Sequence, residues 1–236
     1  MSYAVRLNAW GAVVGGSASS ALIGDPFLYT SRTGMVDIGN LGGGRGMAEG
    51  INDFAVVVGS ARIPTTPVGD IWNIGHAFVY TDESGILDIN NLTRTPGWEL
   101  YDAHAVNDWG LIVGYGQHQT ANGNVLDAYR YNIWTGQVAD LGTFPGGGIS
   151  YAYDINFDGV IVGAAYLDAT GAGNFRAAVW VPGKSGALNL NDLIPSNTGW
   201  TLRQATAINN KGQIVGWGYL NGETRAFRLD PVGQGE

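Results

Sequence analysis

A short pattern recurs five times along the chain, and it constrains the fold more than any other feature of the sequence. Each copy reads Ala-x-x-(Ile, Val or Leu)-Asn, and a Gly follows seven residues after the Asn. The five Asn residues stand 44, 55, 49 and 53 residues apart, so the period is close to 50 residues. The copies begin at Ala4, Ala48, Ala103, Ala152 and Ala205. A period of this length indicates repeated supersecondary units that bury their cores by stacking on one another.

Two further blocks follow the pattern in each unit. An aromatic-rich block occupies residues 27–29, 76–80, 127–131, 176–180 and 225–229. A block that begins with Gly and continues with apolar residues occupies 34–38, 85–89, 136–141 and 186–190, and the fifth unit has no such block. We therefore divide the chain, which we expect to form a single domain, into units 2–44, 45–99, 100–148, 149–200 and 201–236.

The spacing of Asn and Gly predicts the local structure of each unit. Asn at the first and Gly at the fourth position, as in 107–110, 156–159 and 209–212, fits a type I turn, because the Asn side chain bonds the local backbone and Gly adopts a positive φ. This turn joins two strands into a hairpin. The second unit has Ala55 in place of the Gly, so we expect a strained or different turn there.

With the two later blocks as strands, each unit becomes a four-stranded antiparallel meander, and the last unit lacks one strand. Four strands in 40–50 residues are typical of a β-propeller blade. A linear solenoid is the competing interpretation, although solenoid coils usually have shorter repeats. The 38 Gly residues among 236 suit many tight turns and argue against a helical bundle. We predict an all-β fold, a five-bladed β-propeller.

Charge and composition narrow the classes of partner. The net charge is −8, and only two of the twelve basic residues are Lys. The basic residues are scattered, so nucleic acid and anionic membrane surfaces are poor partners. No apolar run is long enough to cross a bilayer, and the first ten residues lack the pattern of a signal peptide. The chain has no Cys, which excludes disulfides and thiol catalysis. We expect protein or glycan partners.

The repeat resembles a known family. The segment Gly75-His-Ala-Phe-Val-Tyr80, the pattern Ile-Asn-x-x-Gly-x-Ile-Val-Gly and the stretch 140–148 resemble the HAF repeats of bacterial proteins, which take their name from the His-Ala-Phe triplet. The resemblance covers all five units, and only the second keeps the triplet itself. It implies a propeller-like repeat protein outside the cell, and it implies no defined activity.

Positions that vary between units are the best candidates for chemistry, because the constant ones serve the fold. If the Ala-x-x-Ile-Asn strand is innermost, its first variable position carries Glu49 and His104 in adjacent units, where the two side chains can approach each other. The next position carries Arg6 and Asp154, which point to the other side of their strands. Acid–base chemistry on a glycan needs two carboxylates, and Glu49, His104 and Asp154 are the nearest candidates for a catalytic set.

A metal motif overlaps the fourth turn. Asp154, Asn156 and Asp158 match the start of a calcium loop, Asp-x-Asn-x-Asp-Gly. An EF-hand needs a Glu six residues after the Gly, and Ala165 stands there, so an EF-hand is excluded. The same residues also form the ordinary Asn-x-x-Gly turn of the repeat. We therefore expect no cofactor, with Ca²⁺ as the alternative.

Exposed Trp residues stack on sugar rings and anchor protein partners. Trp98 and Trp200 occupy equivalent loops between units, and Trp72 lies in an insertion that only the second unit carries. Together with Arg6, these three are the candidate ligand-binding residues. Packing between units is the alternative role for Trp98 and Trp200.

The sequence therefore favours a non-enzymatic interaction or scaffold module outside the cell. The missing strand of the last unit suggests a homo-oligomer, because an exposed edge strand can accept a strand from another chain. A glycan-binding lectin is the first alternative. A glycan-active hydrolase or lyase that uses Glu49, His104 and Asp154 is the second.

Overall fold

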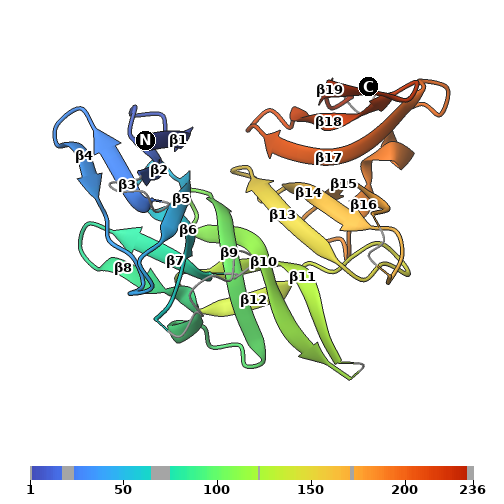
Figure 1. Ribbon diagram of the computed structural model, residues 1–236. Helices are drawn as coiled ribbons and strands as arrows, with labels where there is room; N and C mark the ends of the chain where they lie inside the picture. The colour runs from blue at the N-terminus through green and yellow to red at the C-terminus, as the bar shows by residue number, and fades with distance from the viewer. Residues whose placement is uncertain (1, 18–23, 65–74, 122, 171–172, 233–236) are drawn as a thin grey trace.

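The computed structural model describes residues 2–17, 24–64, 75–121, 123–170 and 173–232, and these form five antiparallel sheets (Figure 1). The first sheet holds β1 (Ser2–Leu7), β2 (Val13–Ser17), β3 (Asp25–Thr30) and β4 (Gly34–Asp37). The second holds β5 (Gly46–Ile51), β6 (Val57–Ala61), β7 (His76–Thr81) and β8 (Gly85–Asp88). The third holds β9 (Trp98–Val106), β10 (Leu111–Thr120), β11 (Gly123–Asn132) and β12 (Gln137–Asp140).

The fourth sheet holds β13 (Ser150–Ile155), β14 (Ile161–Tyr166), β15 (Phe175–Trp180) and β16 (Leu188–Asn189). The fifth holds β17 (Trp200–Ile208), β18 (Ile214–Leu220) and β19 (Glu223–Leu229), and it has three strands in the described residues. Two short 3₁₀ turns, Ile89–Asn91 and Leu190–Leu193, follow the fourth strands of the second and fourth sheets. The predicted all-β class and the strand order within each unit are confirmed.

The first hairpin of each unit also forms as expected. Gly11, Gly110, Gly159 and Gly212 all have positive φ at the fourth position of the turn. Ala55 occupies the same conformation with a φ of 59°, so the second unit keeps the turn and accepts the strain. For an L-residue this left-handed conformation costs about 1–2 kcal/mol.

A β-bulge in the first strand explains the Gly seven residues after each Asn. In all five sheets the pairing register skips the residue after the repeat's first Ala, so this residue has no partner on the second strand. The skipped residues are Val5, Glu49, His104, Tyr153 and Thr206. The opposing Gly lies so close to the bulged strand that a Cβ on Gly163 would stand 1.9 Å from the Tyr151 carbonyl oxygen. Only Gly permits such a close approach.

The repeated Asn residues form a hydrogen-bonded ladder across the units. Asn8 Nδ2 donates to the carbonyl of Asn52, and the same bond joins Asn52 to Asn107, Asn107 to Asn156 and Asn156 to Asn209. Each Oδ1 accepts backbone N–H groups of its own turn. The ladder ends at Asn209, whose Nδ2 donates to Gln213 of the same turn.

The core consists of four equivalent interfaces between consecutive sheets. Each sheet has two faces. The forward face is the one that carries the Val before the Gly of the second strand: Val14, Val58, Val113, Val162 and Val215. We call backward face the face that carries the repeat's first Ala and the aliphatic residue before its Asn. Each apolar cluster joins the forward face of one sheet to the backward face of the next. For example, Val14 and Leu28 of the first sheet pack with Ala48 and Ile51 of the second.

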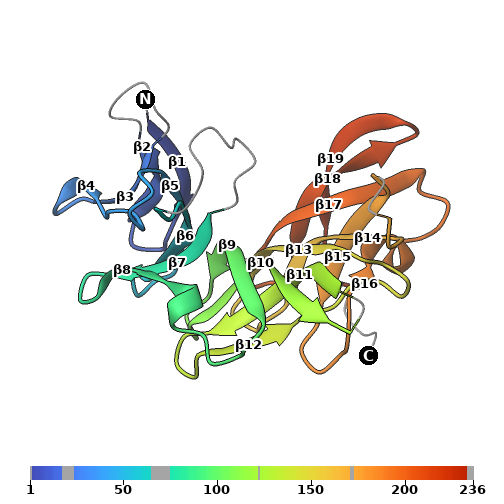
Figure 2. The same ribbon diagram turned by 60° about the horizontal axis from the view of Figure 1, so that its bottom comes forward.

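The sheets surround a common axis. Arg6 of the first sheet donates to Asp154 Oδ1 of the fourth at 2.5 Å. In a linear stack these sheets would be separated by three spacings of about 10 Å each, which no Arg side chain can span. The linear solenoid is therefore excluded. Figures 1 and 2 show the first and fifth sheets at opposite ends of an open arc, so the sheets do not close into a ring.

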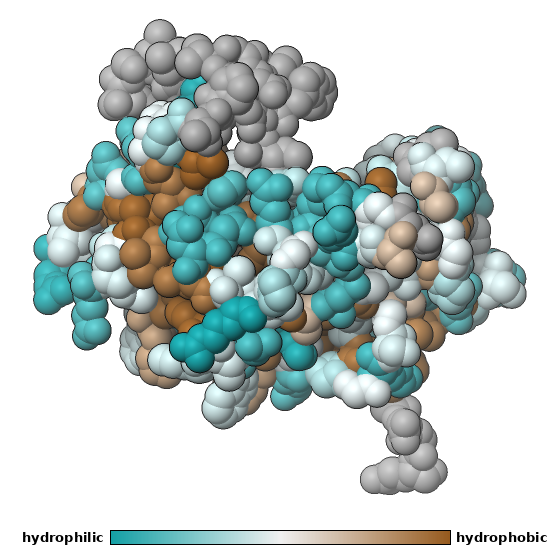
Figure 3. All heavy atoms as spheres, turned by 90° about the horizontal axis from the view of Figure 1, so that it is seen from below, coloured by the Kyte–Doolittle hydropathy of each residue, from teal (hydrophilic) through white to brown (hydrophobic). Residues whose placement is uncertain are grey.

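The described part of the chain contains no helix with the length and hydropathy needed to span a bilayer. Seen from below, apolar residues gather on the side where β4 and β8 lie (Figure 3). These outer strands expose Met35, Val36 and Leu87.

Candidate functional site

The bulged positions of the second and third sheets bring Glu49 and His104 together. His104 Nδ1 lies 2.6 Å from Glu49 Oε2, so the two side chains share a hydrogen bond between adjacent sheets. Both are largely buried. The bulge re-aims each side chain toward the neighbouring sheet, which is a common use of bulges near functional sites. The contact between the two variable residues agrees with the sequence-based expectation.

Asp102 completes the cluster and was missed from the sequence. One ligand atom each of Glu49, Asp102 and His104 lies within 4.8 Å of those of the other two. Ser60 and the Ala103 backbone favour the charged form of the Asp102 carboxyl, against the larger effect of burial on its pKa. Its Oδ1 atom and the Nε2 atom of His104 are buried without a hydrogen-bond partner. A comparison of the column before the repeat's first Ala would have found Asp102, because Tyr3, Met47, Tyr151 and Gln204 stand there in the other units.

Burial and negative charge shape the electrostatics of this cluster. Burial raises the pKa of Asp102 to about 7, against the opposing effect of His104. Burial lowers the pKa of His104, but the charge of Asp102 and the hydrogen bond with Glu49 outweigh it, so the pKa lies above its ordinary value. The rings of Tyr115 and Tyr153 lie against the imidazole, with centroids 5.7 and 5.2 Å away. Burial raises the pKa of both phenols, so they stay neutral hydrogen-bonding groups.

Asp154 does not join this cluster. Its Oδ1 accepts from Arg6, and its Oδ2 accepts the Ile208 N–H at 2.9 Å, so it links the first, fourth and fifth sheets near the axis. The structure therefore does not bring Asp154 together with Glu49 and His104, the other two members of the predicted catalytic set, and it pairs Asp154 with Arg6. For the same reason the Arg6 guanidinium, a predicted ligand-binding group, has a carboxylate partner within the protein.

A pocket of about 220 Å³ has the ion pair of Arg6 and Asp154 in its lining. Residues of all five sheets or their first turns line it, among them Asn52, Asn107 and Asn210. The Asn ladder commits most of these polar groups to bonds between units. The first turns of the five units therefore meet around this pocket, and their Asn side chains bond to one another rather than to a ligand.

Two of the three predicted calcium ligands are already engaged. Asp154 holds Arg6 and the Ile208 N–H, while the Asn156 side chain accepts from Val160 and donates to Asn209. A calcium ion at this turn would have to displace the ladder and the ion pair. The geometry supports the turn role of this segment.

The candidate Trp residues have different surroundings. Trp98 stacks on His118, with centroids 4.2 Å apart and planes inclined by 9°, and Trp200 meets Phe227 edge-on. Both are half-buried, which fits the packing alternative. Trp72 lies outside the described residues.

A second His–carboxylate cluster lies in the third sheet. His118 Nε2 is 3.1 Å from Asp127 Oδ2 and 3.5 Å from Asp140 Oδ2. Asp127 also accepts from the Ser150 hydroxyl. Unlike the cluster around His104, this one contains no buried polar atom that lacks a partner among the described residues.

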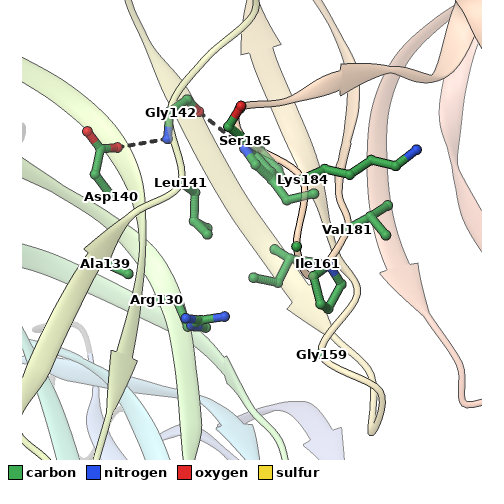
Figure 4. A pocket seen from close by; sticks show the side chains of 14 residues that line it. Arg130, Ala139, Asp140, Leu141, Gly142, Gly159, Ile161, Val181, Lys184 and Ser185 are labelled. Carbon is green, nitrogen blue, oxygen red and sulfur yellow. Dashed lines mark hydrogen bonds between the residues drawn. The ribbon is translucent and has the colours of Figure 1, made fainter.

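The hollow between the third and fourth sheets has a volume of about 310 Å³ (Figure 4). The charged side chains of this hollow come from Arg130, Asp140 and Lys184. Asp140 accepts the Gly142 N–H, and the Gly142 carbonyl accepts from Trp180 Nε1. The second of these bonds joins the two sheets, and the charged groups come from separate elements rather than one cluster. The cluster of Glu49, Asp102 and His104 is therefore the stronger candidate site.

Comparison with known protein families assigns the chain to one of them. A family described as a protein of unknown function, DUF3466, matches residues 44–229. The chain belongs to the DUF3466 family. The match begins at the end of the first unit and covers nearly all of the other four. No curated protein and no solved structure matches the chain.

Proposed function

We propose that the protein is an interaction module, an open five-bladed propeller that assembles with further copies of itself through its two end faces. The proposal rests on a difference in burial between equivalent positions of the five units. Leu7 is 67% exposed, whereas its equivalents Ile51, Val106, Ile155 and Ile208 are at most 9% exposed. Val215 is 40% exposed, whereas Val14, Val58, Val113 and Val162 are fully buried.

These two residues mark the two halves of one interface. Leu7 and the exposed Ala4 belong to the backward face of the first sheet, where no preceding sheet covers them. Val215 and the exposed Ala226 belong to the forward face of the fifth sheet, where no following sheet covers them. Within the chain, forward and backward faces dock four times. The end faces of two copies therefore present the two kinds of face that pack together within the chain, although the forward one also carries Arg228 opposite Val215.

The proposed contact is heterologous, because the forward face of one copy meets the backward face of the next. Such a contact either closes into a ring or grows into longer assemblies. The Asn ladder gives it polar specificity: Asn209 Nδ2, now bonded to Gln213, can turn to the Asn8 carbonyl of the next copy. This interface differs from the sequence-based expectation of strand addition at the last sheet, because it uses sheet faces rather than a strand edge.

A mixing experiment tests the proposal. Leu7→Asp blocks the backward end face, and Val215→Asp blocks the forward one. Sedimentation should show concentration-dependent assembly of the wild type and monomers of each variant alone. An equimolar mixture should give a dimer that grows no further, because one functional face remains on each variant. Phe54→Asp is the control, since Phe54 is 75% exposed but lies in a turn. A wild type that stays monomeric, or variants that fail to pair, would refute the proposal.

The location is proposed from the resemblance to HAF repeats, which favours a site outside the bacterial cell. Fractionation of the native producer with an antibody against the chain tests it. Recovery only from the cytoplasm would contradict this part of the proposal.

A further inference from the structure

We propose that His104 and Asp102 bind a divalent transition-metal ion, with Glu49 as the positioning residue that orients the imidazole. The inference begins with two buried atoms. His104 Nε2 and Asp102 Oδ1 lack hydrogen-bond partners, and they belong to side chains of one three-residue cluster. A buried polar atom without a partner costs about 1–3 kcal/mol. Two of them in one cluster indicate a ligand.

The contact with Glu49 decides which imidazole nitrogen is available. An ionised carboxylate only accepts hydrogen bonds, so His104 Nδ1 carries the proton of the 2.6 Å contact with Glu49. Nε2 is then the nitrogen that remains for a ligand. A carboxylate that holds the far nitrogen of a metal-binding His is a common arrangement, and it fixes both the tautomer and the orientation of the ring.

The donor groups of the cluster suit a cation. Glu49 and Asp102 place two carboxyl groups around one imidazole, with one ligand atom of each residue within 4.8 Å of the others. Arg6, whose charge also acts on His104, is paired with Asp154. In the proposed site the metal ion coordinates both unpartnered atoms. The remaining coordination positions would be open to water or to a ligand.

The donor types select the class of metal. Imidazole nitrogen with carboxylate oxygen suits Zn²⁺ and its neighbours Co²⁺ and Ni²⁺, whereas Ca²⁺ takes six to eight oxygens. The rings of Tyr115 and Tyr153 pack around the imidazole and limit the room for a larger ligand.

The cluster around His118 provides a control within the same chain. It also combines one His with two carboxylates, here both Asp, and one ligand atom of each lies within the same 4.8 Å limit. It contains no unpartnered buried atom among the described residues. If composition alone made a metal site, both clusters would bind; if the unpartnered atoms matter, only the cluster around His104 would bind.

The experiment titrates the chelator-treated full chain with Zn²⁺ by calorimetry and with Co²⁺ by visible absorption. The wild type should bind one ion per chain and show Co²⁺ d–d bands. His104→Phe keeps a ring against the two tyrosines and should abolish both signals, whereas His118→Phe, which keeps a ring against Trp98, should change neither. Asp102→Asn, which is nearly isosteric, should also lose binding even if His104→Phe fails to fold.

The role of Glu49 has a separate readout. Glu49→Ala should weaken Zn²⁺ binding by about 10- to 100-fold, as loss of such a partner usually does. Glu49→Gln, which can still accept from Nδ1, should restore part of the affinity. The proposal is overturned if the wild type binds no Zn²⁺ or Co²⁺, if Asp102→Asn leaves binding unchanged, or if the two His→Phe variants lose binding equally.

Discussion

Replacement of Asn107 by Ala should be among the most destabilising changes to an uncharged side chain in this protein. The Asn107 side chain is buried and makes three hydrogen bonds: Oδ1 accepts from Trp109 and Leu111, and Nδ2 donates to the Asn156 carbonyl. Each is worth about 1 kcal/mol net, so we expect a loss of about 3 kcal/mol. Partners left buried without a bond would increase this loss.

The end of the ladder supplies the matched comparison. Asn209 makes the same two bonds within its turn, but its Nδ2 reaches only Gln213, and the residue is exposed. Water can replace these bonds, so Asn209→Ala should cost about 1 kcal/mol, the usual value for a lost cap. Asn107→Asp keeps the acceptors and removes the donor to the next unit; because it also turns a buried carboxylate toward the Asn156 carbonyl, its loss sets an upper bound on the contribution of the ladder.

Urea denaturation followed by Trp fluorescence and by far-ultraviolet circular dichroism measures these differences, and coincident transitions would justify a two-state analysis. The reasoning is refuted if Asn107→Ala and Asn209→Ala destabilise the chain equally. It is also refuted if Asn107→Asp behaves like the wild type, since the ladder would then contribute nothing.

Three further changes test other parts of the structure. Gly163→Ala places a Cβ 1.9 Å from the Tyr151 carbonyl oxygen and should cost about 3 kcal/mol in the same urea assay; a loss below 1 kcal/mol would mean that the bulge relaxes freely. Ala55→Gly should stabilise the chain by about 0.5 to 1 kcal/mol, because relief of the positive φ exceeds the entropy that Gly adds to the unfolded chain; a lower midpoint would contradict this. His76 donates to Asp88 across 2.7 Å and lies near Glu99. The hydrogen bond with Asp88 and the charges of both carboxylates raise the pKa of His76. The pKa of Asp88 is lowered, because its hydrogen bonds outweigh the effect of its burial. The stabilisation from His76 is complete below pH 6.5 and is lost as the pH rises through its folded pKa, while that from Asp88 is present above pH 3.8 and is lost at lower pH. His76→Gln should therefore cost about 1 to 3 kcal/mol near pH 5 and much less near pH 9, and a cost independent of pH would show that the charge of His76 contributes nothing.

Much of the fold could be predicted from the sequence because every unit forms the same first hairpin from the same residue types. Each first hairpin needs the Asn side chain and a residue with positive φ, so these positions repeat, and even the exception at Ala55 was visible. The bulge was not predicted, because it adds a residue to one strand without changing the pattern of residue types. Its signature was the Gly opposite each bulge, whose role depends on a backbone approach that no sequence pattern shows.

The candidate site could be predicted only in part. Glu49 and His104 were found because equivalent positions in adjacent units must be neighbours. The pairing of Asp154 with Arg6 was not predicted, because Arg6 comes from a unit three repeats away in sequence and only the curvature of the arc brings the two together. That curvature depends on how side chains fill the interface between sheets, which sets the angle from one unit to the next.

The central claim, that the two end faces are assembly surfaces, can be tested most directly by thiol labelling. The chain has no Cys, so Leu7→Cys, Val215→Cys and the control Phe54→Cys each introduce a single reporter. We predict rapid labelling of all three at low protein concentration and selective protection of Cys at positions 7 and 215 as the concentration rises. Equal labelling of all three at every concentration would contradict the account.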